Sequence, residues 1–400
     1  MTAHLSGGYD FHGPRRIVFG WGRRREVGEL ARGLGKRAFV VHGSRSLERQ
    51  GALGDLTAWL QAAGVEVEDL GCVRREPEVD DVDAFSGRLR QRGGRRGDLV
   101  IGFGGGAALD LAKAVCAMAT QREAASVKDY LEGVGRGLVL EELPLPLLAI
   151  PTTAGTGSEA TKNAVISGSE ASPGGRPFKK SLRSEDMVPR VALVDPELCV
   201  SVPAAITAHT GMDAITQLIE SYISRRAQPL PQALALEGLR LAGAAIRRAV
   251  QDGSDRSARE AMSHAALLSG LALANSGLGF AHGVAPALGI HCGVGHGLAC
   301  AVMLPAALRV NRDTCRADLA RLAEVFCGQR FDSEDLAADA CVAAVEALCR
   351  DVGIPPRLRD VGVRREQIPA LVSASRGNSM SANPRDVSDA ELARILEAMF

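Results

Sequence analysis

The first half of the chain alternates short apolar runs with longer amphipathic segments. AFVVHG at 38–43 predicts a buried strand, and the following segment SLERQGALGDLTAWLQAAG predicts an amphipathic helix. Further strands are predicted by VEVEDLG at 65–71, by DLVIGFGGG at 98–106 and by LPLLAIPTTAGTGS, which ends at residue 158. Strands that alternate with helices are typical of a parallel sheet covered by helices on both faces.

Past VALVDPEL at 191–198 the pattern changes. Ala- and Leu-rich helical segments dominate and strand patterns almost vanish, while SGSEASPGGRPFKK at 167–180 predicts a surface turn or hairpin. Because 400 residues exceed what one core usually holds, two domains are expected. We predict an α/β domain over residues 1–197 and a helical domain over 198–400, with a ligand in the cleft between them.

Composition narrows the class of protein. Lys plus Arg and Asp plus Glu number 47 each, which argues against a dedicated nucleic-acid-binding or membrane-surface protein. Nine cysteines are scattered without a CxxC pair, a pattern that favours the reducing cytoplasm over a disulfide framework. Neither a signal-peptide core nor an apolar run of membrane-span length is present. A cytoplasmic protein is therefore expected.

The glycine-rich stretch GFGGGAALD at 102–110 is a candidate phosphate site. Gly104, Gly105 and Gly106 let the backbone approach a phosphate closely, and the helix that follows directs unpaired N–H groups at the anion. Asp110 either caps this helix or orients the loop. A tight turn without a ligand remains an alternative, because the spacing is neither that of a Walker A motif nor GxGxxG.

The loop PTTAGTGSE at 151–159 supplies several hydroxyl groups. Thr152, Thr153 and Thr156 could bind phosphate, ribose or the nicotinamide amide through neutral hydrogen bonds. A polar loop that only caps the next helix is the alternative.

Two later segments carry candidate metal ligands. GMDAITQLIESY at 211–222 places Asp213 and Gln217 four residues apart, on one face of a helix. AHGVAPALGIHCGVGHGLA at 281–299 holds His282 and His296, each followed by glycine in an apolar stretch. A carboxylate and two imidazoles suit zinc or ferrous iron and leave a coordination position open. Core histidines are the alternative, and for His291 we favour packing or support of a ligand.

In this order, the segments resemble the iron-containing (group III) alcohol dehydrogenase family. The resemblance rests on GFGGGAALDLAKA, PTTAGTGSEAT, GMDAITQLIESY and AHGVAPALG followed by GHGLACAVMLP. It implies a dinucleotide-binding α/β domain, a helical C-terminal domain and a metal in the cleft. It also implies interconversion of alcohols with aldehydes or ketones by NAD(H) or NADP(H), and a homodimer is expected.

The resemblance places metal-binding positions on Asp213, His282 and His296. Gln217 stands where a further histidine is usual, and Pro286 stands where many members carry a histidine near the reacting oxygen. We expect Fe²⁺ or Zn²⁺ at the three ligands, with Gln217 as a weak oxygen ligand or a holder of water. Maleylacetate reductases, which work without metal on a similar fold, provide the metal-free alternative.

The resemblance also assigns the cofactor contacts. The glycine loop would seat the pyrophosphate, the three threonines would align nicotinamide and ribose, and Lys179 lies where a lysine often contacts the cofactor. At the end of the predicted strand 38–43, Gly43, Ser44 and Arg45 replace the acid that binds ribose in NAD-preferring members. Arg45 could pair with a 2′-phosphate, so NADP is favoured over NAD.

These observations predict a metal-dependent, NAD(P)H-linked dehydrogenase for a small aliphatic alcohol or aldehyde. Three alternatives remain: a metal-independent reductase, a lyase of the dehydroquinate-synthase type and a non-catalytic nucleotide-binding protein.

Overall fold

The chain forms two compact units. The computed structural model describes residues 8–43, 45–121, 126–169 and 177–400. The sheet unit comprises residues 12–153 and 158–199, and the helical unit comprises 200–400, the short segment 154–157 and the described part of Met1–Phe11. The main change of unit thus follows residue 199.

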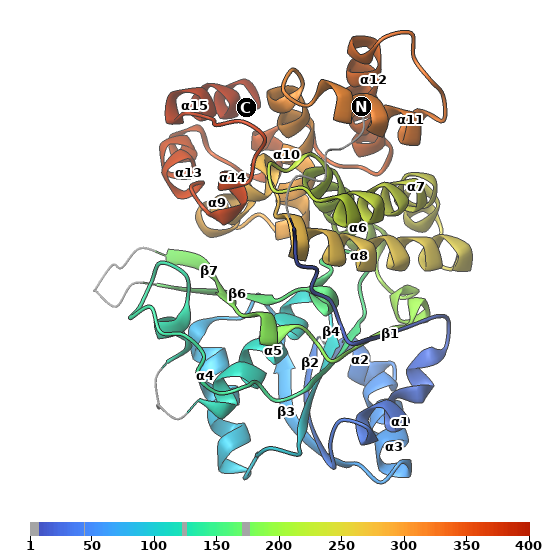
Figure 1. Cartoon of the computed structure of the whole chain (residues 1–400), viewed down its shortest axis with the longest axis vertical. Coiled ribbons are helices and arrows are strands. Elements are labelled where there is room, and N and C mark those ends of the chain that lie inside the picture. Colours follow the sequence, from blue (N-terminus) through green and yellow to red (C-terminus); the bar gives the residue numbers. More distant parts are fainter. Residues whose placement is uncertain (1–7, 44, 122–125, 170–176) are drawn as a thin grey trace. The chain divides into compact units, whose positions relative to one another are not determined.

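The sheet unit is built on six parallel strands in the order β1-β8-β5-β4-β2-β3 (Figure 1). The four predicted strands are present as β2, β3, β4 and β5, and two further strands, β1 and β8, were not predicted. Strands β2, β4 and β5 are fully or largely buried, as expected for a sheet covered on both faces, whereas most residues of the edge strand β3 are only partly buried or exposed. The strands are β1 Arg16–Phe19, β2 Arg37–Gly43, β3 Glu66–Val73, β4 Leu99–Gly104, β5 Leu147–Pro151 and β8 Val191–Val194.

Helices cover both faces of this sheet and enclose two apolar cores. One core joins the sheet to α4 and α5 through residues such as Phe85 and Leu109, and the other joins it to α1 and α3 through residues such as Leu30 and Leu60. The helices are α1 Val27–Arg32, α2 Arg45–Arg49, α3 Ala52–Ala62, α4 Val79–Gln91 and α5 Gly106–Thr120. The predicted doubly covered parallel sheet is confirmed.

The segment after β2 was predicted to form one helix, but it forms two, α2 and α3. Gly51 has a φ of +77°, which interrupts the helical path and separates α2 from α3. Glycine adopts this left-handed conformation without the steric cost that other residues incur.

The predicted turn or hairpin at 167–180 is confirmed. Strands β6 Asn163–Ser169 and β7 Pro177–Arg183 pair in antiparallel register, and the connection over 170–176 lies outside the described residues.

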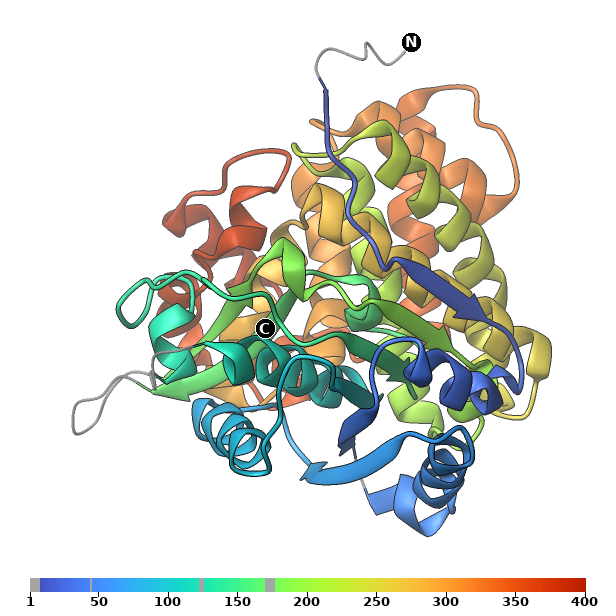
Figure 2. The ribbon, with the colours of Figure 1, turned by 60° about the horizontal axis from the view of Figure 1, so that its bottom comes forward.

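The C-terminal half forms an all-helical unit, as predicted. Helices α6, α7 and α8 pack against one another, and α7 and α8 run side by side in both Figure 1 and Figure 2. The helices of this unit are α6 Ala204–Ile223, α7 Pro229–Gln251, α8 Arg256–Ser276, α9 Phe280–Cys292, α10 His296–Asn311, α11 Arg316–Cys327, α12 Glu334–Asp351, α13 Ile368–Ala374, α14 Asn378–Ser381 and α15 Asp389–Ala398.

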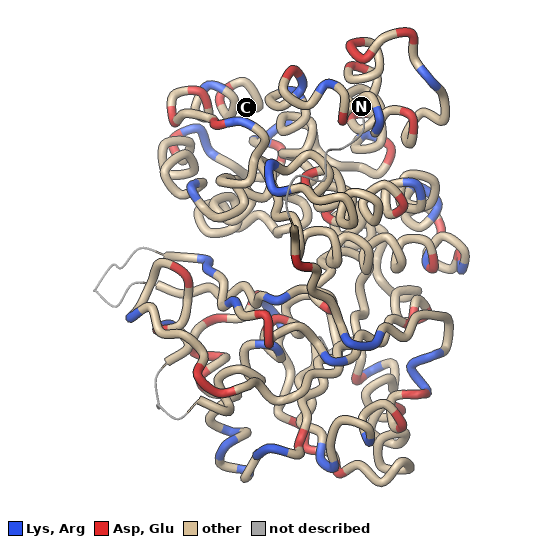
Figure 3. The backbone as a smooth tube through the Cα atoms, in the orientation of Figure 1, with Lys and Arg blue, Asp and Glu red and all other residues tan. Residues whose placement is uncertain are grey.

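Charged residues of both signs are interspersed along both units (Figure 3). All nine cysteines are free. In the part of the chain that the structure describes, no helix is both long enough and apolar enough to cross a membrane.

Candidate functional site

Helix α6 presents three polar side chains from one buried face. Asp213, Gln217 and Glu220 lie at positions i, i+4 and i+7, so they project from the same side of the helix. All three are at most 3% exposed. Burial of a carboxylate costs free energy unless hydrogen bonds or a cation compensate its charge, and a buried amide also requires hydrogen bonds. Each of these three groups therefore requires partners.

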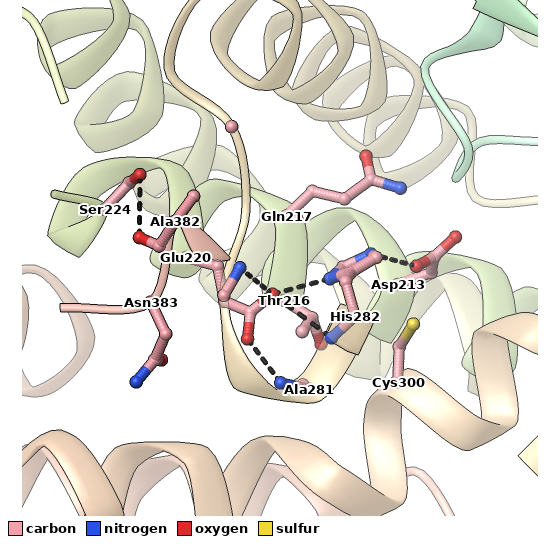
Figure 4. Close-up of polar contacts among 12 residues, drawn as sticks. Asp213, Thr216, Gln217, Glu220, Ser224, Ala281, His282, Cys300, Ala382 and Asn383 are labelled. Atoms are coloured by element: carbon pink, nitrogen blue, oxygen red, sulfur yellow. Dashed lines mark hydrogen bonds and ion pairs between the residues drawn. The ribbon is translucent and has the colours of Figure 1, made fainter. Parts of the chain in front are cut away.

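Glu220 organises the start of helix α9. Its carboxylate accepts hydrogen bonds from the backbone N–H groups of Gly279 at 3.0 Å and Ala281 at 2.6 Å. It also accepts one from the ring Nδ1 of His282 at 2.7 Å. A Cβ atom at Gly279 would lie 3.0 Å from Glu220 Oε1, so glycine allows this close approach. The ring of His282 is therefore fixed with its other nitrogen, Nε2, directed toward Asp213 (Figure 4).

Histidines from two further helices meet the carboxylate of Asp213. His282 Nε2 lies 3.2 Å from Asp213 Oδ1, and His296 Nε2 lies 4.0 Å from the same oxygen. His296 is the first residue of α10, and a Cβ atom at Gly297 would lie 2.6 Å from the carbonyl oxygen of His209 in α6. Glycine at 297 thus lets α10 approach α6 closely enough to bring His296 beside Asp213.

A fourth side chain completes the cluster. Cys300 lies one turn after His296 on α10, and its Sγ is 3.7 Å from His296 Nε2. The ligand atoms of Asp213, His282, His296 and Cys300 all lie within 4.8 Å of one another. A tetrahedral ion with bonds of about 2.0–2.3 Å separates its ligands by about 3.3–3.6 Å, so these residues fit a divalent metal ion.

The electrostatics of the cluster agree with this geometry. Burial lowers the pKa of His282, but Cys300, Asp213 and Glu220 together raise that pKa well above its usual value. Burial raises the pKa of Asp213, but His296 and His282 outweigh it and lower that pKa. The neighbouring groups therefore favour positive charge at this position, which a divalent cation would supply.

The remaining predicted residues near the cluster have other surroundings. The side-chain oxygen of Gln217 accepts a hydrogen bond of 2.6 Å from Ser269 Oγ. Pro286 lies inside α9, and the backbone carbonyl of His291, near the end of that helix, accepts a hydrogen bond from Gln367. Neither Pro286 nor His291 is among the four clustered side chains.

The glycine loop lies at the carboxyl end of the central strands. Gly104 ends β4 and Gly105 precedes α5, whose first residue is Gly106. A Cβ atom at Gly104 would lie 2.8 Å from the backbone nitrogen of Gly43, which ends β2. Strand order reverses between β2 and β4, and such a switch point is where open α/β sheets bind ligands.

The loop that follows β5 contacts the glycine loop. The backbone N–H of Thr152 donates to Gly104 O at 3.0 Å, and Thr153 Oγ1 would lie 3.4 Å from a Cβ atom at Gly105. Asp110 accepts hydrogen bonds from Ser158 Oγ at 2.5 Å and from the backbone of Val165 at 3.0 Å. Asp110 thus orients the loop, and Gly105 rather than Asp110 occupies the N-cap position of α5.

The other predicted cofactor residues, Thr156, Lys179, Ser44 and Arg45, lie in other surroundings or fall outside the described part of the structure. Thr156 belongs to the short segment that packs with the helical unit. Lys179 Nζ forms an ion pair of 2.6 Å with Glu76 Oε1. Ser44 and the side chain of Arg45 lie outside the described residues.

Sequence reasoning missed Glu220 and Cys300. Both offered a spacing signal: Glu220 lies seven residues after Asp213, and Cys300 lies four residues after His296. Helical spacing from a recognised ligand could have found both.

Comparison with known proteins identifies the family. The description "Iron-containing alcohol dehydrogenase" matches residues 14–196, and "Fe-containing alcohol dehydrogenase family, C-terminal" matches residues 207–400. The chain belongs to the iron-containing alcohol dehydrogenase family.

Similar proteins span nearly the whole chain. The 1,3-propanediol dehydrogenase of Klebsiella pneumoniae is 35% identical over 399 residues, which cover 98% of this chain and 99% of that protein. The lactaldehyde reductase of Escherichia coli (strain K12) is 34% identical, with coverage of 92% and 94%. A solved structure of 1,3-propanediol oxidoreductase has a TM-score of 0.90 at 33% identity and covers 98% of this chain and 100% of that chain.

This iron-containing alcohol dehydrogenase family member is an oxidoreductase that interconverts an alcohol with its aldehyde or ketone. Enzymes of the family use NAD(H) and a metal. The predicted family, fold class and enzyme class are confirmed.

Proposed function

We propose that the chain is a metal-dependent dehydrogenase in which Asp213, His282 and His296 hold a divalent ion. The observation that carries this proposal is the convergence of one buried carboxylate and two imidazoles from α6, α9 and α10. A divalent ion at these ligands would supply Lewis-acid polarisation of the substrate oxygen. Iron and zinc are both compatible with this set of three ligands.

The side chains around the proposed ion have separate roles. Glu220 accepts a hydrogen bond from Nδ1–H of His282 and so keeps Nε2 available as a ligand atom. Asp213 stays ionised because the neighbouring histidines lower its pKa below the usual value despite its burial. Gln217, whose oxygen is engaged by Ser269, is better suited to holding the ligand surroundings or a water than to strong coordination.

In the sheet unit, the glycine loop would bind the dinucleotide. Gly104, Gly105 and Gly106 allow the pyrophosphate close access to the backbone at the start of α5. Thr152 and Thr153 adjoin that loop, and Thr156 and Lys179 are further proposed contacts. Asp110 holds the loop through Ser158 and is not itself expected to touch the cofactor.

We further propose a preference for NADP(H), since Gly43, Ser44 and Arg45 provide no carboxylate against a 2′-phosphate. The prediction is that Arg45→Ala weakens NADPH binding about tenfold and NADH binding less than twofold, measured by fluorescence titration. The substitution removes the proposed charge-assisted contact to the 2′-phosphate, a group that NADH does not carry. Equal losses for both cofactors would contradict the preference.

A small aliphatic alcohol or aldehyde as substrate, a homodimer and a cytoplasmic location complete the proposal. Relatives named for propanediol and lactaldehyde support a short-chain substrate. Only 4% of residues are aromatic, which does not favour an aromatic binding platform.

The decisive experiment measures activity on short-chain aldehydes with NADPH and NADH. Protein is stripped with a chelator under anaerobic conditions and then supplied with Fe²⁺ or Zn²⁺. We expect activity to depend on the added metal and to fall at least a hundredfold in Asp213→Asn. The same exchange at the exposed Asp339 of α12 should leave activity unchanged. Full activity in chelator would instead support the metal-free reductase.

A further inference from the structure

Cys300 is the fourth member of the cluster that Asp213, His282 and His296 form. It lies on α10 four residues after His296, so both side chains project from one face of the helix. Its side chain is fully buried, and its Sγ lies 3.7 Å from His296 Nε2. Figure 4 shows the sulfur directed toward Asp213 and His282.

The separations of the ligand atoms suit four-coordinate geometry. An ion bonded to oxygen and nitrogen at about 2.05 Å separates these atoms by about 3.3 Å, and sulfur at about 2.3 Å lies about 3.6 Å from a neighbouring nitrogen. The observed separations are 3.2 Å for Asp213 to His282 and 3.7 Å for Cys300 to His296. Only small side-chain movements would bring all four atoms onto one ion.

Gln217 is a weaker candidate for the fourth position. Its side-chain oxygen accepts a hydrogen bond from Ser269 Oγ, which also lies 2.8 Å from the carbonyl oxygen of Ala266. That oxygen is therefore already engaged with helix α8. A neutral amide is also a poorer ligand for a soft or borderline metal than a thiolate.

The charges also favour Cys300. A divalent cation with one carboxylate, one thiolate and two neutral imidazoles forms a set without net charge, which reduces the cost of burial. The charge of Glu220 is satisfied separately, by backbone N–H groups and the Nδ1–H of His282. A metal ion deprotonates a coordinating thiol, and the proton of Cys300 would leave to solvent.

We propose that Cys300 is a thiolate ligand of the ion, so that the site is an Asp/His/His/Cys centre that prefers zinc. This inference rests on the proposed function, because it requires an ion at Asp213, His282 and His296. Nitrogen and sulfur donors in tetrahedral arrangement are typical of zinc, and the thiolate disfavours harder ions such as Mg²⁺ and Mn²⁺. Zinc in enzymes can expand to five ligands, so a fourth protein ligand is compatible with substrate access.

The test detects the metal–sulfur bond itself. Metal-free protein is loaded with one equivalent of Zn²⁺ for X-ray absorption and with Co²⁺ for optical spectroscopy. We expect a zinc–sulfur distance of about 2.3 Å and a near-ultraviolet sulfur-to-cobalt charge-transfer band. In Cys300→Ser both signals should disappear, and zinc affinity should fall at least tenfold. Cys341→Ala, which removes another buried thiol in α12 of the same unit, should retain both signals.

Other outcomes separate this inference from the proposed function. Stoichiometric metal that requires Asp213 but shows no bound sulfur would overturn the role of Cys300 and leave the metal site intact. Failure to bind metal, or binding unaffected by Asp213→Asn, would overturn both. A sulfur signal that persists in Cys300→Ser would assign the bond to another cysteine. If Cys300→Ser does not fold, the spectra of the unmodified protein still decide whether sulfur is bound.

Discussion

Glu220 binds His282 and the first turn of α9 with a single buried carboxylate. Such partners of metal-binding histidines orient the ring and raise its basicity. We predict that Glu220→Gln weakens metal binding about 10- to 100-fold, because the amide cannot accept hydrogen bonds with both of its terminal atoms. Competition with a metal-binding dye would measure this, on protein whose near-ultraviolet circular dichroism shows it folded.

The matched control is Glu237→Gln on the exposed part of α7, where the carboxylate accepts hydrogen bonds from Arg240. Its metal affinity should equal that of the parent. If Glu220→Gln binds metal as tightly as this control, Glu220 does not position His282.

Glu159 is a buried acid outside the metal cluster. Burial raises its pKa to about 7, and the charge of Lys113, which lowers that pKa, does not offset the effect. Since this value exceeds the unfolded value near 4.5, the folded state binds the proton more tightly. The contribution of Glu159 to the free energy of unfolding is therefore fully present below pH 4.5 and declines as the pH rises through about 7.

Glu159→Gln should remove this decline, because the amide is neutral throughout. We expect the variant to exceed the parent in stability by about 3 kcal/mol at pH 8 and to differ little at pH 4.5. Denaturant unfolding of the cofactor-free protein at several pH values measures the difference. Parallel stability curves for both proteins would show that Glu159 is ionised at neutral pH in the folded state.

At the residue scale, the sequence predicted that Asp213, His282 and His296 lie together, because these residue types and the glycines that follow the two histidines suggest metal ligands. It did not reveal that the oxygen of Gln217 is engaged by Ser269, since 52 residues separate them. Cys300 was overlooked because a lone cysteine in an Ala-rich helix normally indicates packing. Its spacing of four residues from His296 was a usable signal, but only the contacts between α6, α9 and α10 place its sulfur beside the other ligand atoms.

Helices α6 and α10 approach each other where Gly297 faces α6. An added Cβ atom would lie 2.6 Å from His209 O and 3.5 Å from Asp213 Cβ. Backbone atoms cannot move aside as flexible side chains can, so Gly297→Ala should push the start of α10 away. We predict at least a tenfold loss of metal affinity, measured by calorimetric titration.

Gly295→Ala provides the control for this pair of helices. A Cβ atom at Gly295 meets no atom within 4 Å, and its φ of −58° suits any residue. Metal affinity should remain within twofold of the parent. Equal affinities for both alanine variants would show that helix spacing at Gly297 does not set the geometry of the metal ligands.

At the scale of elements, the sequence pattern was sufficient to predict four of the six parallel strands, the hairpin and the helical second half, but it missed the short strands β1 and β8. It could not locate the break between α2 and α3. Gly51 interrupts the helix through its left-handed backbone, whereas Gly54, three residues later, is accommodated inside α3. Periodicity alone does not distinguish these two glycines, because their conformations depend on how the segment packs on the sheet.

At the scale of the whole molecule, the proposed dinucleotide and metal functions reside on different units. The glycine loop belongs to the sheet unit and the metal cluster to the helical unit, so each should be removable without the other. Asp213→Asn should abolish metal binding and change the dinucleotide dissociation constant less than twofold. Fluorescence titration with NADH and NADPH, together with metal analysis of the same samples, measures both properties.

Gly104→Ala should produce the opposite result. Its Cβ atom would lie 2.7 Å from Ala108 Cβ and 2.8 Å from Gly43 N, so the loop must shift from the start of α5. We expect dinucleotide binding to weaken at least tenfold while metal content stays at the parental level. Gly54→Ala, in α3 of the same unit, meets no atom within 4 Å and should change neither property. Unaltered dinucleotide affinity in a folded Gly104→Ala protein would place the pyrophosphate elsewhere, because a displaced loop could not still supply its contacts.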